Sequence, residues 1–358
     1  MKVLHVVGAR PNYMKIAPIM GVMGRFPETF SQMLVHTGQH YDAQMSQVFF
    51  EELGMPRPHV NLEVGSASHA WQTAQVMLRF EPVVQEFEPD WVIVVGDVNS
   101  TLACALVCSK LGVRVAHVEA GLRSFDRTMP EETNRLLTDQ IADLLFTPSP
   151  DGDENLLRES IAPHKIHFVG NVMIDTLIRL LPKAVTLWPQ LQASFGLDRY
   201  ILVTLHRPSN VDDPATLTEI LVALSEISRD LPVLFPVHPR TRQRITEFGV
   251  PAGGVNLLTP LGYLDFLALQ AHAALVLTDS GGIQEETTFL GVPCLTARPN
   301  TERPITITHG TNQLVASQRD ALVAAMCQRL AEQTIPREPP PLWDGRAASR
   351  IVQILRNL

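Results

Sequence analysis

Short apolar runs alternate with longer helical stretches along almost the whole chain, and this alternation limits the fold more than any other feature of the sequence. Continuous apolar runs of this length are typical of strands buried on both faces of a sheet. Strands that alternate with helices predict parallel sheets with helices on both faces, which is an α/β fold. The candidate strands are Val3–Val7, Met33–His36, Trp91–Val95, Val113–Val118, Leu144–Thr147, Ile166–Val169, Tyr200–Thr204, Val233–Val237, Val255–Leu258, Ala274–Thr278 and Pro293–Leu295.

The length of 358 residues suits two domains better than one. The strand–helix pattern loosens over residues 170–199 before a new strand begins. We therefore expect two doubly wound, Rossmann-like domains, at residues 1–170 and 171–344. A last helix at 345–358, after the Pro-rich run 338–343, is expected to cross back to the first domain. Because ligands bind beyond the carboxyl ends of such strands, two sets of strand-end loops predict an active site in a cleft between the domains.

Composition and charge exclude several classes of protein. Hydrophobic residues make up 45% of the chain and charged residues 18%, as in a globular protein, and no segment has the apolar length of a membrane span. The chain starts as a strand and not as a signal peptide, so we expect a cytoplasmic protein without membrane contact. A formal net charge of −8 argues against nucleic-acid binding. The four cysteines and twelve histidines show no metal-ligand spacing, so no metal is expected.

A Ser-Gly-Gly turn between a predicted strand and a predicted helix, from Ser280 to Gly282, is typical of a phosphate and sugar site. Glycines let backbone N–H groups approach a diphosphate closely, and the positive end of the following helix favours the anion. The carboxylate of Glu286, one turn into that helix, can accept hydrogen bonds from the hydroxyls of a ribose. The alternative is a tight turn in which Ser280 only caps the helix.

Cations that a bound diphosphate would need stand mostly in turns that follow predicted strands, where ligands of such sheets bind. Lys15 fits this role less clearly, because it also fits the exposed face of a helix. The set comprises Arg10, Lys15, His206, Arg207, His238, Arg240 and Arg303.

Three carboxylates in the first half of the chain are candidates for proton transfer. Asp97 and Glu119 each end a predicted strand, and Glu131 begins a predicted helix after Pro130. Structural roles compete with this interpretation, since Asp97 could cap the helix that follows it and Glu131 is favourable in a first helical turn. Clustered carboxylates at a sugar site are natural groups to remove and return a proton. The chain lacks a Gly-x-Gly-x-x-Gly turn after its first strand and a Walker Gly-Lys-Ser/Thr motif, so hydride transfer and ATP hydrolysis are disfavoured and no cofactor is expected.

Several motifs in a fixed order resemble the non-hydrolysing UDP-N-acetylglucosamine 2-epimerase family over essentially the whole chain. The resemblance implies a glycosyltransferase-B-like architecture of two Rossmann-like domains, a UDP-sugar substrate and a homodimer. The motifs are Val7-Gly8-Ala9-Arg10-Pro11-Asn12, His36-Thr37-Gly38-Gln39-His40, Gly96-Asp97, His117-Val118-Glu119-Ala120-Gly121-Leu122-Arg123-Ser124, Pro130-Glu131-Glu132 with Asn134-Arg135, His206-Arg207, His238-Pro239, Thr278-Asp279-Ser280-Gly281-Gly282 with Gln284-Glu285-Glu286, and Thr301-Glu302-Arg303-Pro304.

The reaction that the resemblance implies is reversible epimerisation at C2, from UDP-N-acetylglucosamine to UDP-N-acetylmannosamine, with no metal or oxidised cofactor. The C2 proton is removed while UDP leaves C1. The resulting 2-acetamidoglucal and UDP stay bound until UDP adds again and a proton returns to the other face. Such sugars feed polysaccharides of the cell envelope.

Matching motif to motif gives each candidate residue a role. The catalytic set is Asp97, Glu119 and Glu131 as acid/base groups, His206 as partner of the leaving phosphate, and Lys15 beside them. The UDP-binding set is Arg10, Ser280, Gly281 and Gly282 at the diphosphate, Glu286 at the ribose, Arg303, and Phe266, where the backbone of the family holds uracil.

A second substrate molecule activates many bacterial members of the family. Gln39, His40, Arg207 and His238 match that activator site. The sequence departs from it at Asp42, where a Gln is expected, and in the segment 66–72, which lacks an arginine. Allosteric activation is therefore in doubt.

Other reactions and other protein classes stay open. One is a hydrolysing relative that releases N-acetylmannosamine and UDP, and another is an epimerase of a UDP-2,3-diacetamido uronic acid. A third is a glycosyltransferase of the same architecture, which shares the nucleotide half but does not need three carboxylates. A non-catalytic nucleotide-sugar sensor would bind its ligand without exchange of the C2 proton.

Overall fold

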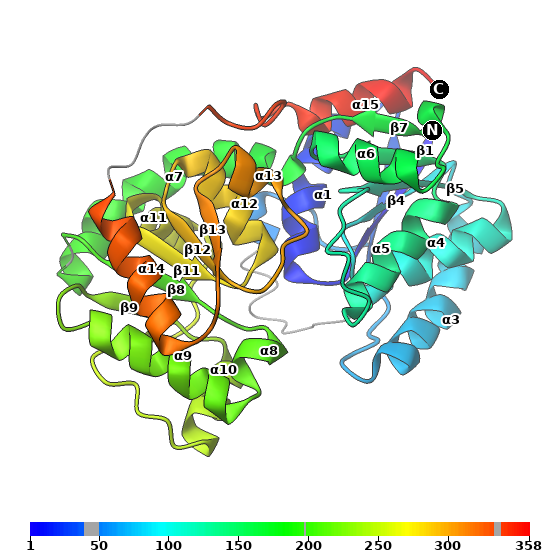
Figure 1. Ribbon diagram of the computed structural model, residues 1–358. Coiled ribbons are helices and arrows are strands. Elements are labelled where there is room, and N and C mark those ends of the chain that lie inside the picture. Colours follow the sequence, from blue (N-terminus) through cyan, green and yellow to red (C-terminus); the bar gives the residue numbers. More distant parts are fainter. Residues whose placement is uncertain (39–49, 197, 333–337) are drawn as a thin grey trace. The chain divides into compact units, whose positions relative to one another are not determined.

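The protein divides into two compact units in the computed structural model, which describes residues 1–38, 50–196, 198–332 and 338–358. Unit 1 comprises Met1–Thr176 and Pro341–Leu358, and unit 2 comprises Leu177–Pro340 (Figure 1). Each unit is built around one parallel sheet flanked by helices, so the α/β class expected from the sequence is confirmed. The chain passes from one unit to the other within the long helix α7 (Val172–Phe195).

Unit 1 has a seven-stranded sheet in the order β3-β2-β1-β4-β5-β6-β7, with every neighbouring pair parallel. The order reverses between β1 and β4, which is the point at which doubly wound sheets bind ligands. The strands are β1 Lys2–Val7, β2 Ser31–His36, β3 Val60–Asn61, β4 Trp91–Val95, β5 Arg114–Val118, β6 Leu144–Thr147 and β7 Ile166–Phe168. The helices are α1 Arg10–Met23, α3 His69–Phe87, α4 Asn99–Leu111, α5 Pro130–Ile141, α6 Pro150–Arg158, the 3₁₀ turn η1 Pro163–Lys165 and α15 Ala347–Arg356.

The C-terminal helix α15 belongs to unit 1, where it packs against α1 (Figure 1). The carboxylate of Asp175 accepts hydrogen bonds from the N–H groups of Ala347 and Ala348, at 3.1 and 2.7 Å, and so holds the first turn of α15. The indole of Trp343 donates to the carbonyl of Pro148 at 2.9 Å. Burial raises the pKa of Asp175 to about 6 in spite of the two backbone donors.

Unit 2 has a six-stranded sheet in the order β10-β9-β8-β11-β12-β13, again parallel throughout, with its reversal between β8 and β11. The strands are β8 Ile201–Thr204, β9 Val233–Pro236, β10 Asn256–Leu258, β11 Leu275–Thr278, β12 Cys294–Ala297 and β13 Asn312–Val315. The helices are α8 Pro208–Val211, α9 Pro214–Ile227, α10 Pro239–Glu247, α11 Tyr263–His272, α12 Gly281–Leu290, α13 Ile305–Thr308 and α14 Arg319–Ala331.

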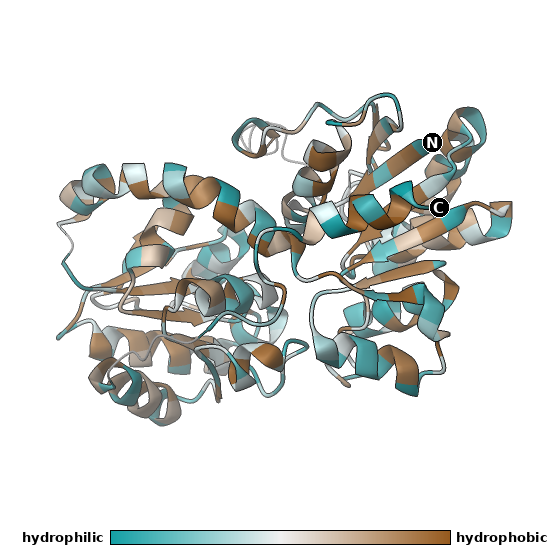
Figure 2. Cartoon of the chain, turned by 90° about the horizontal axis from the view of Figure 1, so that it is seen from above, coloured by the Kyte–Doolittle hydropathy of each residue, from teal (hydrophilic) through white to brown (hydrophobic). Residues whose placement is uncertain are grey.

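Each unit has its own apolar core on the faces of its sheet. Figure 2 shows mainly hydrophobic strands flanked by helices in which hydrophobic and hydrophilic residues alternate. In unit 1, Phe80 of α3 and Cys104 of α4 pack over the sheet, and in unit 2 Phe235 of β9 and Leu221 of α9 are buried in the same way. Burial of such apolar surface is the main source of stability for both sheets.

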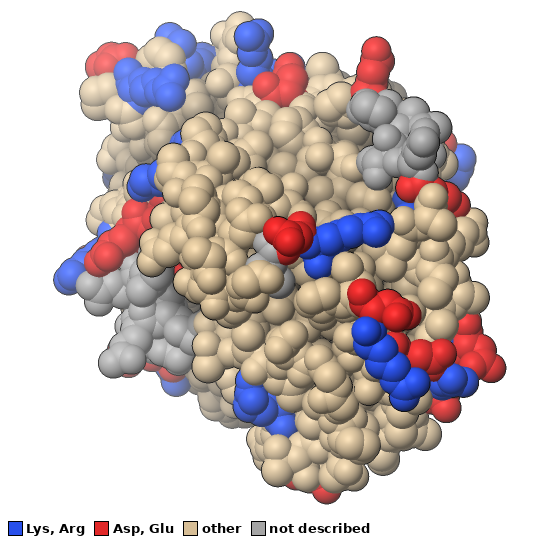
Figure 3. Space-filling model, turned by 90° about the vertical axis from the view of Figure 1, so that its left-hand side faces the viewer, with Lys and Arg blue, Asp and Glu red and all other residues tan. Residues whose placement is uncertain are grey.

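The surface shown in Figure 3 carries mostly uncharged side chains. Lys and Arg side chains on this face lie next to Asp or Glu in several places, so they form no broad basic area there. Among the described residues, no helix is both long enough and apolar enough to cross a bilayer.

Candidate active site

Polar turns follow the strands on either side of the reversal in unit 1. The turn from Gly8 to Arg10 follows β1, and Gly96-Asp97 follows β4. The amide of Asn12 joins the two turns, since its oxygen accepts from the N–H groups of Gly8 and Ala9 at 3.0 Å and its nitrogen donates to the carbonyl of Val95 at 3.2 Å. The sheet therefore holds both turns next to each other at the place where a ligand is expected.

Glu119, at the end of β5, forms a buried ion pair with Lys15 of α1. Both side chains are less than 10% exposed. Glu119 has a backbone φ of 71°, a left-handed conformation that costs a residue other than glycine about 1–3 kcal/mol. A Cβ on Gly96 would lie 2.9 Å from Lys15 Nζ and 3.2 Å from Glu119 Oε2, so the turn that carries Asp97 lies directly against this pair. Lys15 is thus a buried partner of Glu119 and not a residue of an exposed helix face.

Asp97 is held by Arg135 of α5. Arg135 Nε and Nη2 both donate to Asp97 Oδ2, at 3.1 and 2.7 Å, while Nη1 donates to Glu132 Oε2 at 2.5 Å. The N-cap of helix α4 is Val98, the residue after Asp97. The Asp97 carboxylate is about a quarter exposed, which lets it meet a ligand.

Glu131 lies in the first turn of α5 and is partly buried. The neighbouring Glu132 is buried and orders the loop before the helix, because its carboxylate accepts from the N–H groups of Ser124 and Phe125. Asn134 of the same helix donates to the carbonyl of Asp97 at 2.9 Å. The start of α5, with Glu131, is therefore packed against the turn that carries Asp97.

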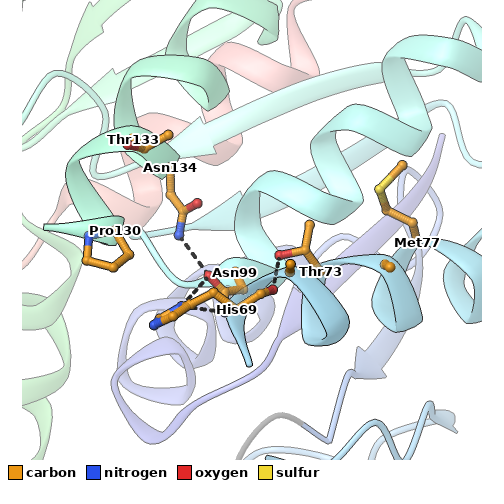
Figure 4. Close-up of a pocket in the computed structure, with 9 residues that line it drawn as sticks. His69, Thr73, Met77, Asn99, Pro130, Thr133 and Asn134 are labelled. Atoms are coloured by element: carbon orange, nitrogen blue, oxygen red, sulfur yellow. Dashed lines mark hydrogen bonds between the residues drawn. The ribbon is translucent and has the colours of Figure 1, made fainter. Parts of the chain in front are cut away.

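A pocket of about 420 Å³ opens beside this turn, between the N-terminal parts of three helices (Figure 4). Its polar centre is Asn99, which donates to Gln72 at 2.7 Å and accepts from Asn134 at 3.2 Å. The lining comprises His69, Ala70, Thr73, Ala74 and Met77 from α3, Asn99 from α4, and Pro130, Thr133 and Asn134 from α5. No Lys or Arg is among these described lining residues.

In unit 2, the buried carboxylate of Asp279 orients His206. Asp279 accepts from the N–H groups of His206 and Arg207 and from the amide of Asn210, and it lies 3.1 Å from His206 Nδ1. Burial alone would raise the pKa of Asp279, but the donors and His206 outweigh it and hold the pKa below its usual value. The His206 side chain is half exposed. Since Nδ1 faces Asp279, Nε2 is the ring nitrogen that can meet a ligand.

The Ser280-Gly281-Gly282 turn joins β11 to α12, directly after Asp279. Ser280 is the N-cap by its backbone, but its side chain makes no capping hydrogen bond, so it does not have the purely capping role considered above. A Cβ on Gly281 would lie 2.2 Å from Arg303 Nη1, so only glycine leaves room for this arginine. Arg303 pairs with Glu302 at 2.6 Å and with Glu285 at 3.0 Å. The N-terminus of α12 and the Arg303 guanidinium therefore lie side by side, an arrangement that favours an anion.

Glu286 is buried in α12 and accepts a hydrogen bond from the hydroxyl of Tyr263 at 2.9 Å. Its second oxygen, Oε2, is also buried and has no hydrogen-bond partner among the described residues. Burial raises the pKa of Glu286 to about 7, and Glu285 adds to the shift. Phe266 lies half-buried on α11, one turn after Tyr263, and packs against the core that contains Tyr200. An acceptor without a donor at this depth is suited to a hydroxyl of a bound ligand.

A family model settles the relationship of this chain to known proteins. The model described as UDP-N-acetylglucosamine 2-epimerase matches residues 26–356.

The chain belongs to the UDP-N-acetylglucosamine 2-epimerase family.

Two relatives resemble the chain over its full length. The UDP-N-acetylglucosamine 2-epimerase of Methanocaldococcus jannaschii is 42% identical over 366 residues, which is 99% of each chain. The UDP-2,3-diacetamido-2,3-dideoxy-D-glucuronate 2-epimerase of Pseudomonas aeruginosa is 43% identical over 364 residues, which is 100% of each chain. The crystal structure of the M. jannaschii enzyme, in complex with UDP-GlcNAc and UDP, has a TM-score of 0.93 with 42% identity, and the match covers 100% of each chain.

Of the four residues that match an activator site, the structure describes two, Arg207 and His238. Gln39 and His40 lie outside the described residues. Arg207 donates from Nε to the carbonyl of Asp279 at 3.1 Å and lies 3.5 Å from Glu302, so it is part of the network around His206. His238 is exposed and caps α10 by accepting from the N–H of Arg240 at 3.3 Å. Arg10 is the first residue of α1.

Proposed function

We propose that the protein interconverts UDP-N-acetylglucosamine and UDP-N-acetylmannosamine by inverting C2 of the sugar. The observation that carries this proposal is the pair of carboxylates at neighbouring strand ends, Asp97 and Glu119, each oriented by its own cation. Arg135 holds Asp97 and Lys15 holds Glu119. Two oriented carboxylates are what removal of a proton from one face of a carbon and its return to the other face require.

Epimerisation proceeds here by elimination and re-addition of UDP. One carboxylate takes the C2 proton, the C2–H electron pair forms the C1=C2 double bond, and the C1–O bond breaks with its electrons going to the diphosphate. The products are 2-acetamidoglucal and UDP. In the reverse sense UDP adds again to C1 while a proton is given to the opposite face of C2. Asp97, Glu119 and Glu131 are the proposed acid/base groups.

Unit 2 is proposed to bind UDP and to stabilise it as a leaving group. Ser280, Gly281 and Gly282 at the start of α12 bind the diphosphate together with Arg10 and Arg303, and His206 Nε2 faces the phosphate that leaves. Glu286 accepts from the ribose, and the backbone at Phe266 holds uracil. Donors placed where negative charge develops lower the barrier more than donors that bind the intact substrate equally well.

The test is proton NMR of UDP-N-acetylglucosamine incubated with the protein in heavy water, with no metal or nicotinamide added. Deuterium at C2, together with UDP-N-acetylmannosamine, is the expected result. Free N-acetylmannosamine and UDP would instead indicate the hydrolysing reaction. An unchanged spectrum at millimolar substrate would contradict the proposal for this sugar.

A second candidate substrate is UDP-2,3-diacetamido-2,3-dideoxy-D-glucuronate. The observation that favours it is the P. aeruginosa relative named for this sugar, which matches the chain as closely as the M. jannaschii enzyme does. The chemistry at C2 is the same, so the same experiment with this sugar decides between the two. A kcat/KM ratio of more than about tenfold between the sugars, in either direction, identifies the preferred substrate.

The pH dependence of UDP binding tests the role of Glu286. Its pKa of about 7 means that the carboxyl is largely protonated at pH 6 and ionised at pH 8. An ionised carboxylate accepts with both oxygens, so the Kd for UDP should fall, by up to about tenfold per pH unit below the pKa, as the pH rises through 7. The same raised pKa acts in the opposite direction on the stability of the free protein. Because folded Glu286 holds its proton more tightly than unfolded Glu286 does, the free energy of unfolding decreases as the pH rises toward and through 7.

Calorimetric titration of the wild type and the Glu286→Gln variant between pH 6 and 8 measures this effect. Phosphate groups titrate near pH 6, so the difference between the two proteins, and not either curve alone, reports the carboxyl. Parallel curves for the two proteins would contradict a ribose contact by Glu286.

The proposal extends to a cytoplasmic homodimer that acts in cell-envelope polysaccharide synthesis, as the family resemblance implies. Light scattering should give twice the chain mass of 39.7 kDa, and the mass of one chain would contradict it.

An activator site with Gln39, His40, Arg207 and His238 also stays a proposal. A hyperbolic dependence of rate on substrate concentration would count against it, because a second substrate molecule that activates gives a sigmoidal curve.

A further inference from the structure

His117 is fully buried in β5, between the two turns that carry the candidate acid/base carboxylates. Its Nε2 lies 2.8 Å from the carbonyl oxygen of Gly96, the residue before Asp97. Its Nδ1 lies 2.6 Å from Asp139 Oδ1 on α5. One imidazole ring therefore joins the Asp97 turn to a second element of unit 1.

Both partners of His117 are acceptors. A carbonyl oxygen can only accept, and Asp139 is ionised, since His117 and Arg123 hold its pKa below the usual value although burial alone would raise it. Each ring nitrogen of His117 therefore faces an acceptor, one on the Asp97 turn and one on α5. A buried imidazole held from both sides is oriented firmly, and its bond to the ionised carboxylate is charge-assisted.

Asp139 carries the connection on to the Glu119 turn. Its other oxygen, Oδ2, accepts from the N–H of Gly121 at 3.1 Å and lies 2.7 Å from Arg123 Nη2. Gly121 stands two residues after Glu119. The path from Gly96 through His117 and Asp139 to Gly121 thus consists of three hydrogen bonds, all of them buried.

The Glu119 turn has a backbone conformation that needs such support, because Glu119 is not a glycine. Gly96, Glu119 and Gly121 have φ values of 67°, 71° and 79°. Gly121 is also confined from behind, since a Cβ there would lie 2.4 Å from the carbonyl oxygen of Gly152. A left-handed glutamate persists only where its surroundings determine it, so the position of the Glu119 carboxylate depends on the contacts of its turn.

We propose that His117 is a positioning residue, which fixes the carboxylate of Asp97 relative to that of Glu119 by binding Gly96 and Asp139 at the same time. This inference rests on the proposed function, in which both carboxylates act on one carbon. A displacement of about 1 Å in a catalytic group can cost about 10²-fold in rate, so the separation of the two turns matters more to turnover than to ligand binding.

Two substitutions at His117 separate its two hydrogen bonds. The amide nitrogen of Asn takes the place of Nδ1, so His117→Asn keeps the bond to Asp139 and loses the bond to Gly96. The amide nitrogen of Gln takes the place of Nε2, so His117→Gln keeps the bond to Gly96. Both variants remove the imidazole ring, and they differ in which of its two partners stays bound.

We expect kcat to fall about 100-fold in His117→Asn and about 10-fold or less in His117→Gln, with the Kd for UDP within about twofold of the wild type in both. In heavy water, deuterium that returns to the original face of C2 gives the starting sugar, and deuterium that returns to the opposite face gives the epimer. The ratio of deuterated starting sugar to deuterated epimer should rise in the Asn variant, because a displaced carboxylate no longer protonates the opposite face. A purely structural role would lower thermal stability in both variants without changing this ratio. Asp175→Asn is the control. It replaces another buried carboxylate of unit 1, one that holds the first turn of α15, and it should leave kcat unchanged.

Equal loss of kcat in the Asn and Gln variants, or loss of UDP affinity in step with kcat, would overturn the positioning role. If neither variant folds, Asp139→Asn leaves His117 in place and weakens its orientation. A kcat about tenfold lower supports the proposal, and an unchanged kcat overturns it. Failure of the proposed function looks different, because the wild type itself would then show no exchange at C2 with either sugar.

Discussion

Replacing Glu119 with glutamine should lower kcat by about 10³-fold while the Kd for UDP changes less than about threefold. An amide has the shape of the carboxylate but cannot take a proton. The amide oxygen can still accept from Lys15, so the buried lysine keeps a partner and the turn keeps its conformation. UDP is proposed to bind through residues of unit 2 and Arg10, and not through Glu119, so its affinity should not depend on this carboxylate. Steady-state kinetics with calorimetric titration of UDP measure both quantities.

A matched control for Glu119 is Glu88, another glutamate of unit 1 in the left-handed region, with φ of 51° at the C-cap of α3. Glu88→Gln changes the same group in a similar backbone conformation away from the strand-end turns, and it should leave kcat unchanged. A Glu119→Gln variant with wild-type kcat would remove Glu119 from the acid/base set. Loss of UDP affinity in step with kcat would indicate a role in ligand binding instead.

Most strands were predictable because strands buried on both faces are continuously apolar. All five residues of β4, for example, are apolar and buried. The structure adds two strands that the sequence did not reveal, β3 and β13, and both lie at an edge of their sheet. β3 has only two residues, and β13 reads Asn-Gln-Leu-Val with two residues partly exposed. An edge strand can be short and polar because only one of its sides pairs, so it lacks the signal that identifies central strands.

The position of the candidate site was predictable for the same reason. Parallel sheets bring the carboxyl ends of their strands together, so polar residues just after apolar runs, such as Asp97 and Glu119, could be expected at one edge of the sheet. Lys15 could not be assigned, because its helix has no pattern that distinguishes a buried lysine from an exposed one. The structure decides the matter by the contact with Glu119.

The residues that orient the site were missed because they act across the fold. Arg135 and Asp97 are 38 residues apart, and Asp279 and His206 are 73 apart. A signal for Asp279 was present, since an acidic residue directly after a buried strand needs a donor if the strand end is covered. Its donors could not be identified without knowing that β8 and β11 are neighbours.

Asp279 leads to the second large effect, because it should matter to turnover almost as much as His206, which it orients. His206→Asn should lower kcat about 10²–10³-fold by removing the donor to the leaving phosphate. Asp279→Asn should lower kcat about 10²-fold, since an amide no longer stabilises a proton on Nδ1 and the ring is free to turn. The substitution also places an NH₂ group, which can only donate, opposite the groups of His206, Arg207 and Asn210 that donate to Asp279. Part of the loss should therefore appear as weaker UDP binding.

The double variant distinguishes orientation of His206 from two independent roles. If Asp279 acts through the imidazole, removing both groups should lower kcat little more than removing His206 alone, because residues that act as a unit are not additive. Asp213→Asn is the matched control, an exposed aspartate that caps α9 in the same unit and accepts from the N–H of Thr216 at 2.8 Å. It should leave kcat unchanged. Losses that multiply in the double variant would mean that Asp279 stabilises the turn or the ligand by a route that does not pass through His206.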